Sequence, residues 1–184
     1  MNRTLIAGVG NIFLGDDGFG VEVAQRLAAR ALPPGVEVVD FGIRALDLGY
    51  ALQDGYACTL LLDTVQRGGV PGSLYLIEPD KAAAPHGAQD AQPLAPHDLT
   101  PDSVLRFARA MGSAHQQILL LGCEPESFGT EDEADGRLGL SEPVAASVGV
   151  AVSFIESLLS RAQEQGRDLD EMANAAGHCL SAHR

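Results

Sequence analysis

Three polar side chains from separate segments of this sequence have the chemical types that metal-dependent or acid–base chemistry requires. Asp17 follows a short apolar run, Asp63 ends the run LLLD, and His97 lies in LAPHDLT just before a predicted helix. Two carboxylates within about 4–6 Å of one another repel, and a bound cation relieves that repulsion. Two oxygen ligands and one nitrogen ligand can hold zinc, nickel or a similar divalent ion and leave positions open.

Each of these residues also has an ordinary structural interpretation. One of the adjacent Asp16 and Asp17 can cap the following helix, while the other projects into a ligand-binding crevice at the carboxyl edge of the predicted sheet. Asp63 can instead accept hydrogen bonds from a neighbouring loop, and His97 can be a surface histidine. The other histidines lie in loops or in the tail and receive no role, and the nearby Asp98 is interpreted as a helix-entry residue; those histidines are His86, His115, His178 and His183.

Motifs of other chemistries are incomplete or absent. A GxGxxG fingerprint would need glycine where Phe13 stands, and the helix is expected to begin only near Asp17 or Gly18, so nucleotide binding is disfavoured. The sequence has no HExxH and no GxSxG, which argues against a helix-borne zinc protease and a nucleophile elbow. Cys123 ends the run LLLGC and could be a nucleophile, but such a cysteine is more often a small buried apolar residue.

Composition limits the class of partner. The 184 residues suit one domain, and 25 acidic residues against 12 Lys and Arg give a formal charge of -13. Nucleic acid and anionic membranes are therefore disfavoured as partners. An odd number of cysteines (three) without CxxC fits a reducing compartment. The first residues do not resemble a signal peptide, and no continuous apolar run approaches the roughly 20 residues that span a bilayer, so a cytoplasmic protein is expected.

Apolar runs of strand length alternate with stretches of helical period. Strands are predicted at 4–10, 36–40, 58–65 and 116–122, and helices at 18–31, 44–53, 100–111 and 141–159. Continuous apolar strands that alternate with helices predict an α/β sheet covered on both faces. A tight turn at 67–72 leads to a strand at 73–78, which is expected to pair antiparallel with the strand 58–65 and to make the sheet mixed.

The remaining segments define the predicted domain boundary. Residues 79–96 and 126–139 are expected to be long loops, and residues 161–184 a flexible polar tail behind a single domain at 1–160. In open α/β sheets, ligands bind beyond the carboxyl ends of the strands. Asp17 and Asp63 are both expected at that edge.

Several segments together resemble the hydrogenase maturation proteases over roughly residues 4–160. They are GVGNIFLGDDGFGVEVAQRL (8–27), DFGIRALDL (40–48), LLLDTV (60–65), APHDLT (95–100), LLLGCEPES (119–127) and GLSEPV (139–144). The resemblance implies a three-layer α/β/α fold with a twisted, mostly parallel five-stranded sheet. It also implies a metal site of Asp17, Asp63 and His97, the same residues that the crevice argument selects. Ile43 and Ala45 stand where the family often has Thr and a second Gly.

The resemblance further implies a reaction and a partner. The partner is the precursor of a nickel–iron hydrogenase large subunit, and the reaction removes its C-terminal extension after nickel insertion. Nickel supplied by the substrate would be the recognition element, although another divalent cation could occupy the same ligands. The alternatives are a non-catalytic nickel-binding maturation chaperone and a nucleotide-binding regulator.

Overall fold

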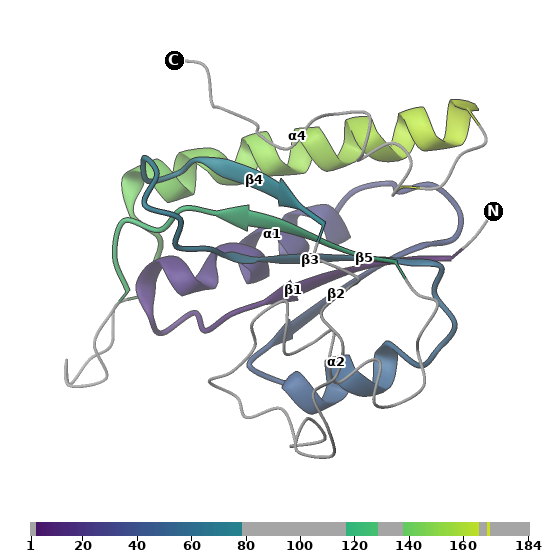
Figure 1. The fold of residues 1–184 in the computed structure, drawn as a ribbon, viewed down its shortest axis with the longest axis horizontal. Helices are drawn as coiled ribbons and strands as arrows, with labels where there is room; N and C mark the ends of the chain where they lie inside the picture. Colours follow the sequence, from purple (N-terminus) through teal and green to yellow (C-terminus); the bar gives the residue numbers. More distant parts are fainter. Residues whose placement is uncertain (1–2, 79–116, 129–137, 166–168, 170–184) are drawn as a thin grey trace.

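The computed structural model describes residues 3–78, 117–128, 138–165 and 169. A five-stranded sheet in the order β2-β1-β3-β5-β4 forms its middle layer (Figure 1). The strands are β1 (Thr4–Val9), β2 (Val36–Gly42), β3 (Cys58–Thr64), β4 (Leu74–Ile77) and β5 (Gln117–Cys123). All neighbouring pairs are parallel except β4 and β5, which run in opposite directions. The predicted mixed, mostly parallel sheet is confirmed.

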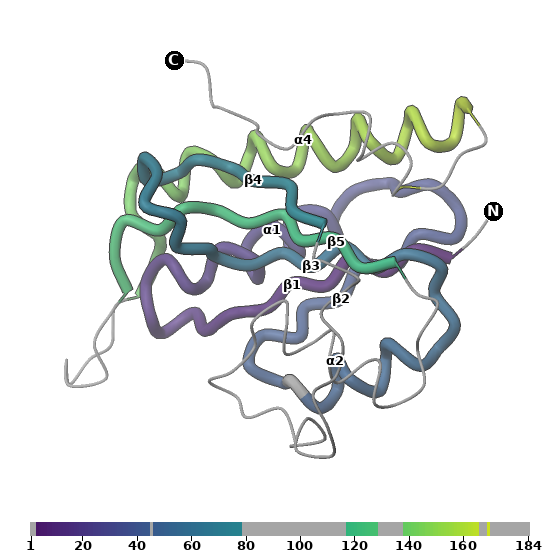
Figure 2. The backbone as a smooth tube through the Cα atoms, in the orientation of Figure 1, coloured from purple at the N-terminus to yellow at the C-terminus, as the bar shows by residue number. Residues whose placement is uncertain are grey.

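Helices cover both faces of this sheet. α1 (Phe19–Ala28) and α4 (Glu142–Gln165) lie on one face and α2 (Ala45–Ala51) on the other, as the tube in Figure 2 also shows. Side chains of successive strand residues alternate between the faces. Leu60 and Leu62 therefore pack in the cluster with α1 and α4, whereas Leu61 packs in the cluster with α2. The three-layer α/β/α prediction is confirmed.

The partner of β4 differs from the prediction. β4 was expected beside β3, but β5 lies between them and pairs with both. The burial of the two strands explains this order. Every residue of β5 is buried, as expected of a strand with neighbours on both sides, whereas the four residues of β4 alternate between buried and half-buried. A short strand of that kind suits the edge of a sheet.

α4 is longer than predicted and serves as the core helix of the domain. It ends at Gln165 rather than near Leu159, and Ala162 and Leu169 are buried in the same cluster. Among the described helices it alone is long and apolar enough to cross a membrane by length and composition, which differs from the sequence-based expectation. Its buried apolar residues, however, lie against α1 and the sheet, and its outward face carries Ser153, Arg161 and the exposed Val150.

A glycine allows α1 to begin directly over the strand ends. A Cβ on Gly20 would lie 2.0 Å from the Leu62 carbonyl oxygen and 2.4 Å from the Val9 carbonyl oxygen. Only glycine tolerates so close an approach of helix and strand. The glycines of the first segment thus serve packing, and they bring the turn before α1 to the carboxyl ends of β1 and β3. The predicted loop 79–96 and helix 100–111 lie outside the described residues.

Candidate active site

The structure places two of the three predicted site residues at the carboxyl edge of the sheet. Asp17 belongs to η1 (Gly15–Gly18), the single 3-10 turn between β1 and α1, and Asp63 is the next-to-last residue of β3. His97 lies outside the described residues, so its place in the site stays a prediction. Within the described part of the chain, no three His, Cys, Asp or Glu residues are grouped closely enough to hold a metal ion.

Asp17 lies in a tight loop that its own carboxylate stabilises. The Asn11 backbone N–H donates to Asp17 Oδ2 at 2.7 Å, and the Thr64 hydroxyl donates to the same carboxylate. Gly10 has φ 130°, and a Cβ there would lie 1.8 Å from the Asp17 carbonyl oxygen, so this turn requires glycine. Burial raises the pKa of Asp17, and the two hydrogen bonds only partly oppose that rise.

Asp63 has a pKa raised well above its ordinary value. Burial is the main cause, the hydrogen bond from the Thr64 backbone N–H to Oδ1 at 2.7 Å opposes it, and the negative charge of Asp17 raises the pKa further. Thr64 thus bridges the pair, because its N–H binds Asp63 and its hydroxyl binds Asp17. Two carboxylates that disfavour each other's charge form a site that gains free energy when it takes up a proton or a cation.

Asp16 has a different role from the predicted helix cap. Neither η1 nor α1 has a side-chain cap, so the expectation that one of the two aspartates caps the helix is wrong. Asp16 is fully buried and accepts four hydrogen bonds from distant segments: from the backbone N–H groups of Glu126 (2.8 Å), Ser127 (3.0 Å) and Ser141 (2.6 Å), and from the Ser141 hydroxyl (3.0 Å). The carboxylate therefore ties η1 to the segment after β5 and to the start of α4.

The electrostatics of Asp16 follow from these donors. Burial by itself would raise the pKa of Asp16, but the hydrogen bonds from Ser127, Ser141 and Glu126 outweigh burial and lower the pKa. The carboxylate is thus held charged and its oxygens are occupied. Asp16 positions the loops around the site and is not itself available as a ligand.

Glu124 is a second buried carboxylate of this kind, and the sequence reasoning missed it. It follows β5, is 5% exposed, and accepts hydrogen bonds from the backbone N–H groups of Arg67 (3.0 Å) and Gly68 (3.0 Å). Burial would raise its pKa, but these bonds, together with those from Gly69 and the Tyr75 hydroxyl, lower it. Glu124 therefore holds the turn between β3 and β4. The signals in the sequence were its place directly after a buried strand and within the segment LLLGCEPES.

Cys123 is a buried thiol and not a nucleophile at this site. Its side chain is fully buried in the core, and its Sγ lies 3.3 Å from the Ser147 Oγ. Burial is the main cause that raises the pKa of Cys123 to about 11. A thiol with so high a pKa is protonated at neutral pH and unreactive. The interpretation of Cys123 as a small buried residue is thus supported.

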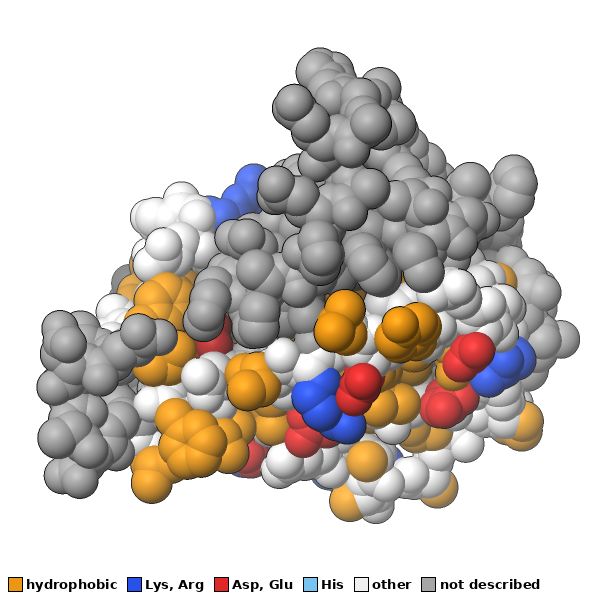
Figure 3. All heavy atoms as spheres, turned by 90° about the horizontal axis from the view of Figure 1, so that it is seen from below, with side chains coloured by type: hydrophobic (Ala, Val, Ile, Leu, Met, Phe, Trp, Pro, Cys, Tyr) orange, Lys and Arg blue, Asp and Glu red, His pale blue; other side chains and the backbone are white. Residues whose placement is uncertain are grey.

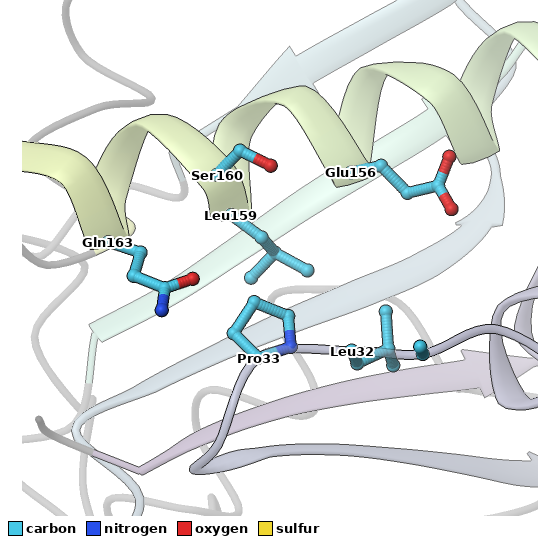
Figure 4. A pocket seen from close by; sticks show the side chains of 7 residues that line it. Leu32, Pro33, Glu156, Leu159, Ser160 and Gln163 are labelled. Atoms are coloured by element: carbon cyan, nitrogen blue, oxygen red, sulfur yellow. The ribbon is translucent and has the colours of Figure 1, made fainter.

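A hollow of about 410 Å³ lies far from these carboxylates. Leu32 and Pro33, just before β2, and Glu156 and Leu159 of α4 line it (Figure 4). The start of β2 is at the amino edge of the sheet, opposite the edge that carries Asp17 and Asp63. The hollow is therefore no part of the candidate active site.

The fold and the site together define a class of protein. It is an α/β protein with a mostly parallel sheet and a pair of interacting acids at the carboxyl ends of two adjacent strands, β1 and β3. This is the position at which open α/β sheets bind their ligands. Comparison with known proteins identifies the family within that class.

The family model described as hydrogenase maturation protease matches residues 21–158. The hydrogenase expression/formation protein HupD of Rhodobacter capsulatus is 33% identical over 124 residues, which are 67% of this chain and 57% of that protein. HoxM of Azotobacter vinelandii, described in the same words, is 30% identical over 176 residues, covering 93% of this chain and 81% of that protein. The structure of the hydrogenase maturating endopeptidase HybD from E. coli matches with a TM-score of 0.66 and 26% identity over 89% of this chain and 94% of that one.

The chain therefore belongs to the hydrogenase maturation protease family. Its sequence resemblance and its fold agree on this assignment. The matched range contains Asp63 and His97, whereas Asp17 precedes it by four residues.

Proposed function

We propose that this chain is an endopeptidase that removes the C-terminal extension of the large-subunit precursor of a nickel–iron hydrogenase after nickel insertion. The observation that carries the proposal is the coupled Asp17–Asp63 pair at the carboxyl edge of the sheet. Membership of the hydrogenase maturation protease family supports the class of substrate.

Nickel belongs to the substrate in this proposal. Asp17, Asp63 and His97 bind the nickel that the precursor already contains, and this binding aligns the scissile bond with the site. The negative charge of Asp17 disfavours the charge of Asp63, and an approaching cation relieves that repulsion, which supports this step. A precursor without nickel lacks the recognition element and is not cut. Other divalent cations can compete for the same oxygen and nitrogen ligands.

The proposed chemistry is attack by water on the scissile carbonyl carbon. A carboxyl group with a raised pKa can accept the proton that water loses and return it to the departing amine when the C–N bond breaks. Nickel beside the carbonyl contributes proximity and polarisation of that bond. Cys123 is too deeply buried to form a covalent intermediate, which supports water as the nucleophile.

The proposed setting is the cytoplasm, with neither nucleic acid nor a membrane as partner. The formal charge of -13 argues against nucleic acid and anionic membranes as partners, because phosphate backbones and anionic lipids repel such a chain. It also favours partners that carry positive charge.

Intact-mass measurement of the precursor tests the proposal. The large-subunit precursor from the same organism is incubated, with and without nickel, with the wild-type chain and with Asp17→Asn, Asp63→Asn and His97→Ala. Asp54→Asn serves as the matched control, because it removes one negative charge at an exposed position that precedes β3. We expect the wild type and the control to release the extension only from nickel-loaded precursor, and the three site variants to release none.

Two outcomes contradict the proposal. If the wild type binds nickel tightly but the precursor mass does not change, the chain is a nickel-binding chaperone. If Asp17→Asn and His97→Ala both cleave normally, the proposed site is wrong. A thermal shift with nucleotides, measured on the same preparation, would favour a nucleotide-binding regulator.

A further inference from the structure

Thr64 joins the two carboxylates of the candidate site through two different groups. Its backbone N–H donates to Asp63 Oδ1 at 2.7 Å, and its hydroxyl donates to the Asp17 carboxylate. The backbone bond needs no particular side chain, whereas the second bond requires a hydroxyl at this position. The hydroxyl is therefore the part of this bridge that depends on the residue type and that a substitution can remove.

The backbone of Thr64 is held in place by the neighbouring strand. The pairing of β3 with β1 ends at Gly8 and Leu62. Its pairing with β5 continues to Thr64 and Cys123, and the Val65 N–H then donates to the Cys123 carbonyl oxygen at 2.9 Å. η1 contacts this end of β3, where Thr64 binds Asp17. A side chain on a paired strand thus reaches the turn that carries one of the two acids, and paired strands hold such groups more precisely than loops do.

The side chain of Thr64 lies on the face of the sheet from which Asp17 comes. Side chains alternate between the two faces along β3, so Thr64 shares the face of Leu62, which packs in the cluster with α1 and α4. Asp63 shares the face of Leu61, which packs in the cluster with α2. Asp17 belongs to η1, which leads directly into α1. The two carboxylates therefore reach the edge of the sheet from opposite faces, and Thr64 connects them.

The hydroxyl of Thr64 opposes a movement that electrostatic repulsion favours. Among the described residues, two groups donate to the Asp17 carboxylate: the Asn11 N–H, at 2.7 Å from Oδ2, and the Thr64 hydroxyl. A single donor on one oxygen leaves a carboxylate able to turn about that bond. The charge of Asp17 disfavours the charge of Asp63, so repulsion favours a rotation of Asp17 away from its neighbour. The hydroxyl draws Asp17 toward the residue whose backbone also binds Asp63.

The surroundings of this bridge favour a lasting hydrogen bond. Asp17, Asp63 and Thr64 are half-buried, and the loop before η1 carries the large apolar side chains of Ile12 and Phe13. In Figure 3, which shows the molecule from the α2 side, hydrophobic side chains gather at the left, where the carboxyl ends of the parallel strands lie in Figure 1. A hydrogen bond with less water around it is electrostatically stronger than one on an open polar surface.

We propose that Thr64 is a positioning residue for the reaction, because its hydroxyl holds Asp17 at the spacing from Asp63 at which one cation contacts both carboxylates. The inference rests on the proposed function, in which both carboxylates bind the nickel of the precursor. With both ligands already in place, the scissile bond is aligned without a prior rotation of Asp17. The branch at Cβ restricts the rotation of a threonine side chain, so threonine holds the hydroxyl more firmly than serine would.

Cleavage kinetics on nickel-loaded precursor test this inference. Thr64→Val keeps the shape of the side chain and the backbone N–H but removes the hydroxyl, whereas Thr64→Ser keeps the hydroxyl and removes the methyl group. We expect Thr64→Val to lower kcat about tenfold with KM unchanged within about twofold, and Thr64→Ser to stay within about threefold of the wild-type kcat. Thr4→Val is the matched control, because it removes a hydroxyl at the buried start of β1, at the opposite edge of the sheet, and should change neither constant.

The side-chain rotamer of Asp17 gives a second readout that does not depend on cleavage. Three-bond NMR couplings to the Asp17 Cγ, measured on metal-free protein, report the χ1 angle of this residue. We expect values of a single rotamer in the wild type and in Thr64→Ser, and values averaged over several rotamers in Thr64→Val. A single rotamer in Thr64→Val, or averaging in the wild type, would show that the hydroxyl does not position Asp17.

Three kinetic or thermal results also overturn the positioning role while the proposed function stands. The first is an unchanged kcat for Thr64→Val. The second is a Thr64→Ser variant as slow as Thr64→Val, which would show that the hydroxyl is not the cause. The third is a melting temperature of Thr64→Val several degrees below that of the wild type, which would mean that Thr64 acts through the stability of the fold. Absence of cleavage by the wild type itself would instead contradict the proposed function, and the couplings would still test the position of Asp17.

Discussion

Asp16 and Asp17 are adjacent in the chain and have identical side chains, but the pKa of Asp16 is lowered and that of Asp17 is raised. Asp16 is buried with four hydrogen-bond donors on its carboxylate, which hold its pKa below the ordinary value. Asp17 has two donors and a raised pKa, and it lies close enough to Asp63 to raise the pKa of that residue too. Burial acts on both residues, so the number of donors decides the difference.

The same contrast separates the ends of two neighbouring strands. Glu124 follows β5 and is saturated by the turn between β3 and β4, whereas Asp63 ends β3 with one backbone donor and a like charge nearby. Asp16 and Glu124 therefore stabilise the loops of this edge, and Asp17 and Asp63 are left able to bind. A carboxylate whose oxygens are all occupied by hydrogen-bond donors stabilises the loops around it. A pair of carboxylates with few donors remains available to bind a proton or a cation.

The largest expected effect on stability comes from Asp16→Asn. The amide retains one acceptor oxygen but directs an NH₂ group at backbone N–H donors, so we expect the free energy of unfolding to fall by roughly 2–4 kcal/mol. Asp17→Asn should change it by less than about 1 kcal/mol, because its carboxylate has fewer donors and is repelled by Asp63. Urea unfolding in the presence of a chelator measures both. Equal losses for the two variants would remove the distinction.

A smaller loss is expected for Glu124→Gln. This change weakens the bonds to Arg67, Gly68 and Gly69 and should cost about 1–2 kcal/mol. Hydrogen exchange of the Gly68 and Gly69 amides should become faster. Glu22→Gln, which loses only an exposed ion pair with Arg26, is the control and should cost at most about 0.5 kcal/mol. Unchanged exchange at Gly68 would show that Glu124 does not hold the turn.

The two groups of carboxylates should respond to pH with opposite sign. Because burial and the charge of Asp17 raise the pKa of Asp63, the contribution of Asp63 to stability is full below its ordinary value of 3.8 and is lost as pH rises through the folded-state pKa. Asp16, with a lowered pKa, contributes above 3.8 and loses that contribution as pH falls through its folded-state pKa.

The free energy of unfolding of Asp63→Asn should therefore exceed that of the wild type at pH 7, and the difference should shrink toward pH 4. The free energy of unfolding of Asp16→Asn should instead stay below that of the wild type over that range, and this difference should shrink only at lower pH. Urea unfolding of metal-free protein at pH 4, 5, 6 and 7 gives both curves. A constant difference between Asp63→Asn and the wild type would contradict the raised pKa.

The smallest effect on activity is expected for Cys123→Ala. Cleavage of the precursor should stay within about twofold of the wild type, and the free energy of unfolding should fall by about 1 kcal/mol, because a buried sulfur and its contact with Ser147 are lost. In a Cys179→Ser background, Cys123 of the folded chain should react with iodoacetamide far more slowly than in the unfolded chain. Rapid modification, with loss of cleavage, would return Cys123 to the list of catalytic candidates.

The sequence predicted the elements of this fold better than their arrangement. The apolar runs that became β1, β3 and β5 were identified because each is buried on both faces and needs no alternation. The partner of β4 was predicted wrongly, because a tight turn indicates direction but not which strand is inserted between its two arms. β5 is more than 50 residues from β3, and no local pattern records that pairing.

The candidate site was predicted in the same uneven way. Asp17 and Asp63 were selected because they follow buried strands, and the coupling between them supports that choice. His97 stays a prediction. The role of Asp16 was missed, because local spacing suggested a helix cap and its actual donors lie 110 to 125 residues further along the chain.

By itself, the sequence determined which segments are strands and helices and which acids stand at strand ends, because burial periodicity and helix-breaking residues act within a few positions of the chain. The tertiary structure alone decided which acid is held charged and which is left unsaturated. That choice depends on backbone N–H groups brought from the segment after β5 and from the start of α4. A carboxylate's proton affinity is set by the donors and charges around it, whatever their distance in sequence.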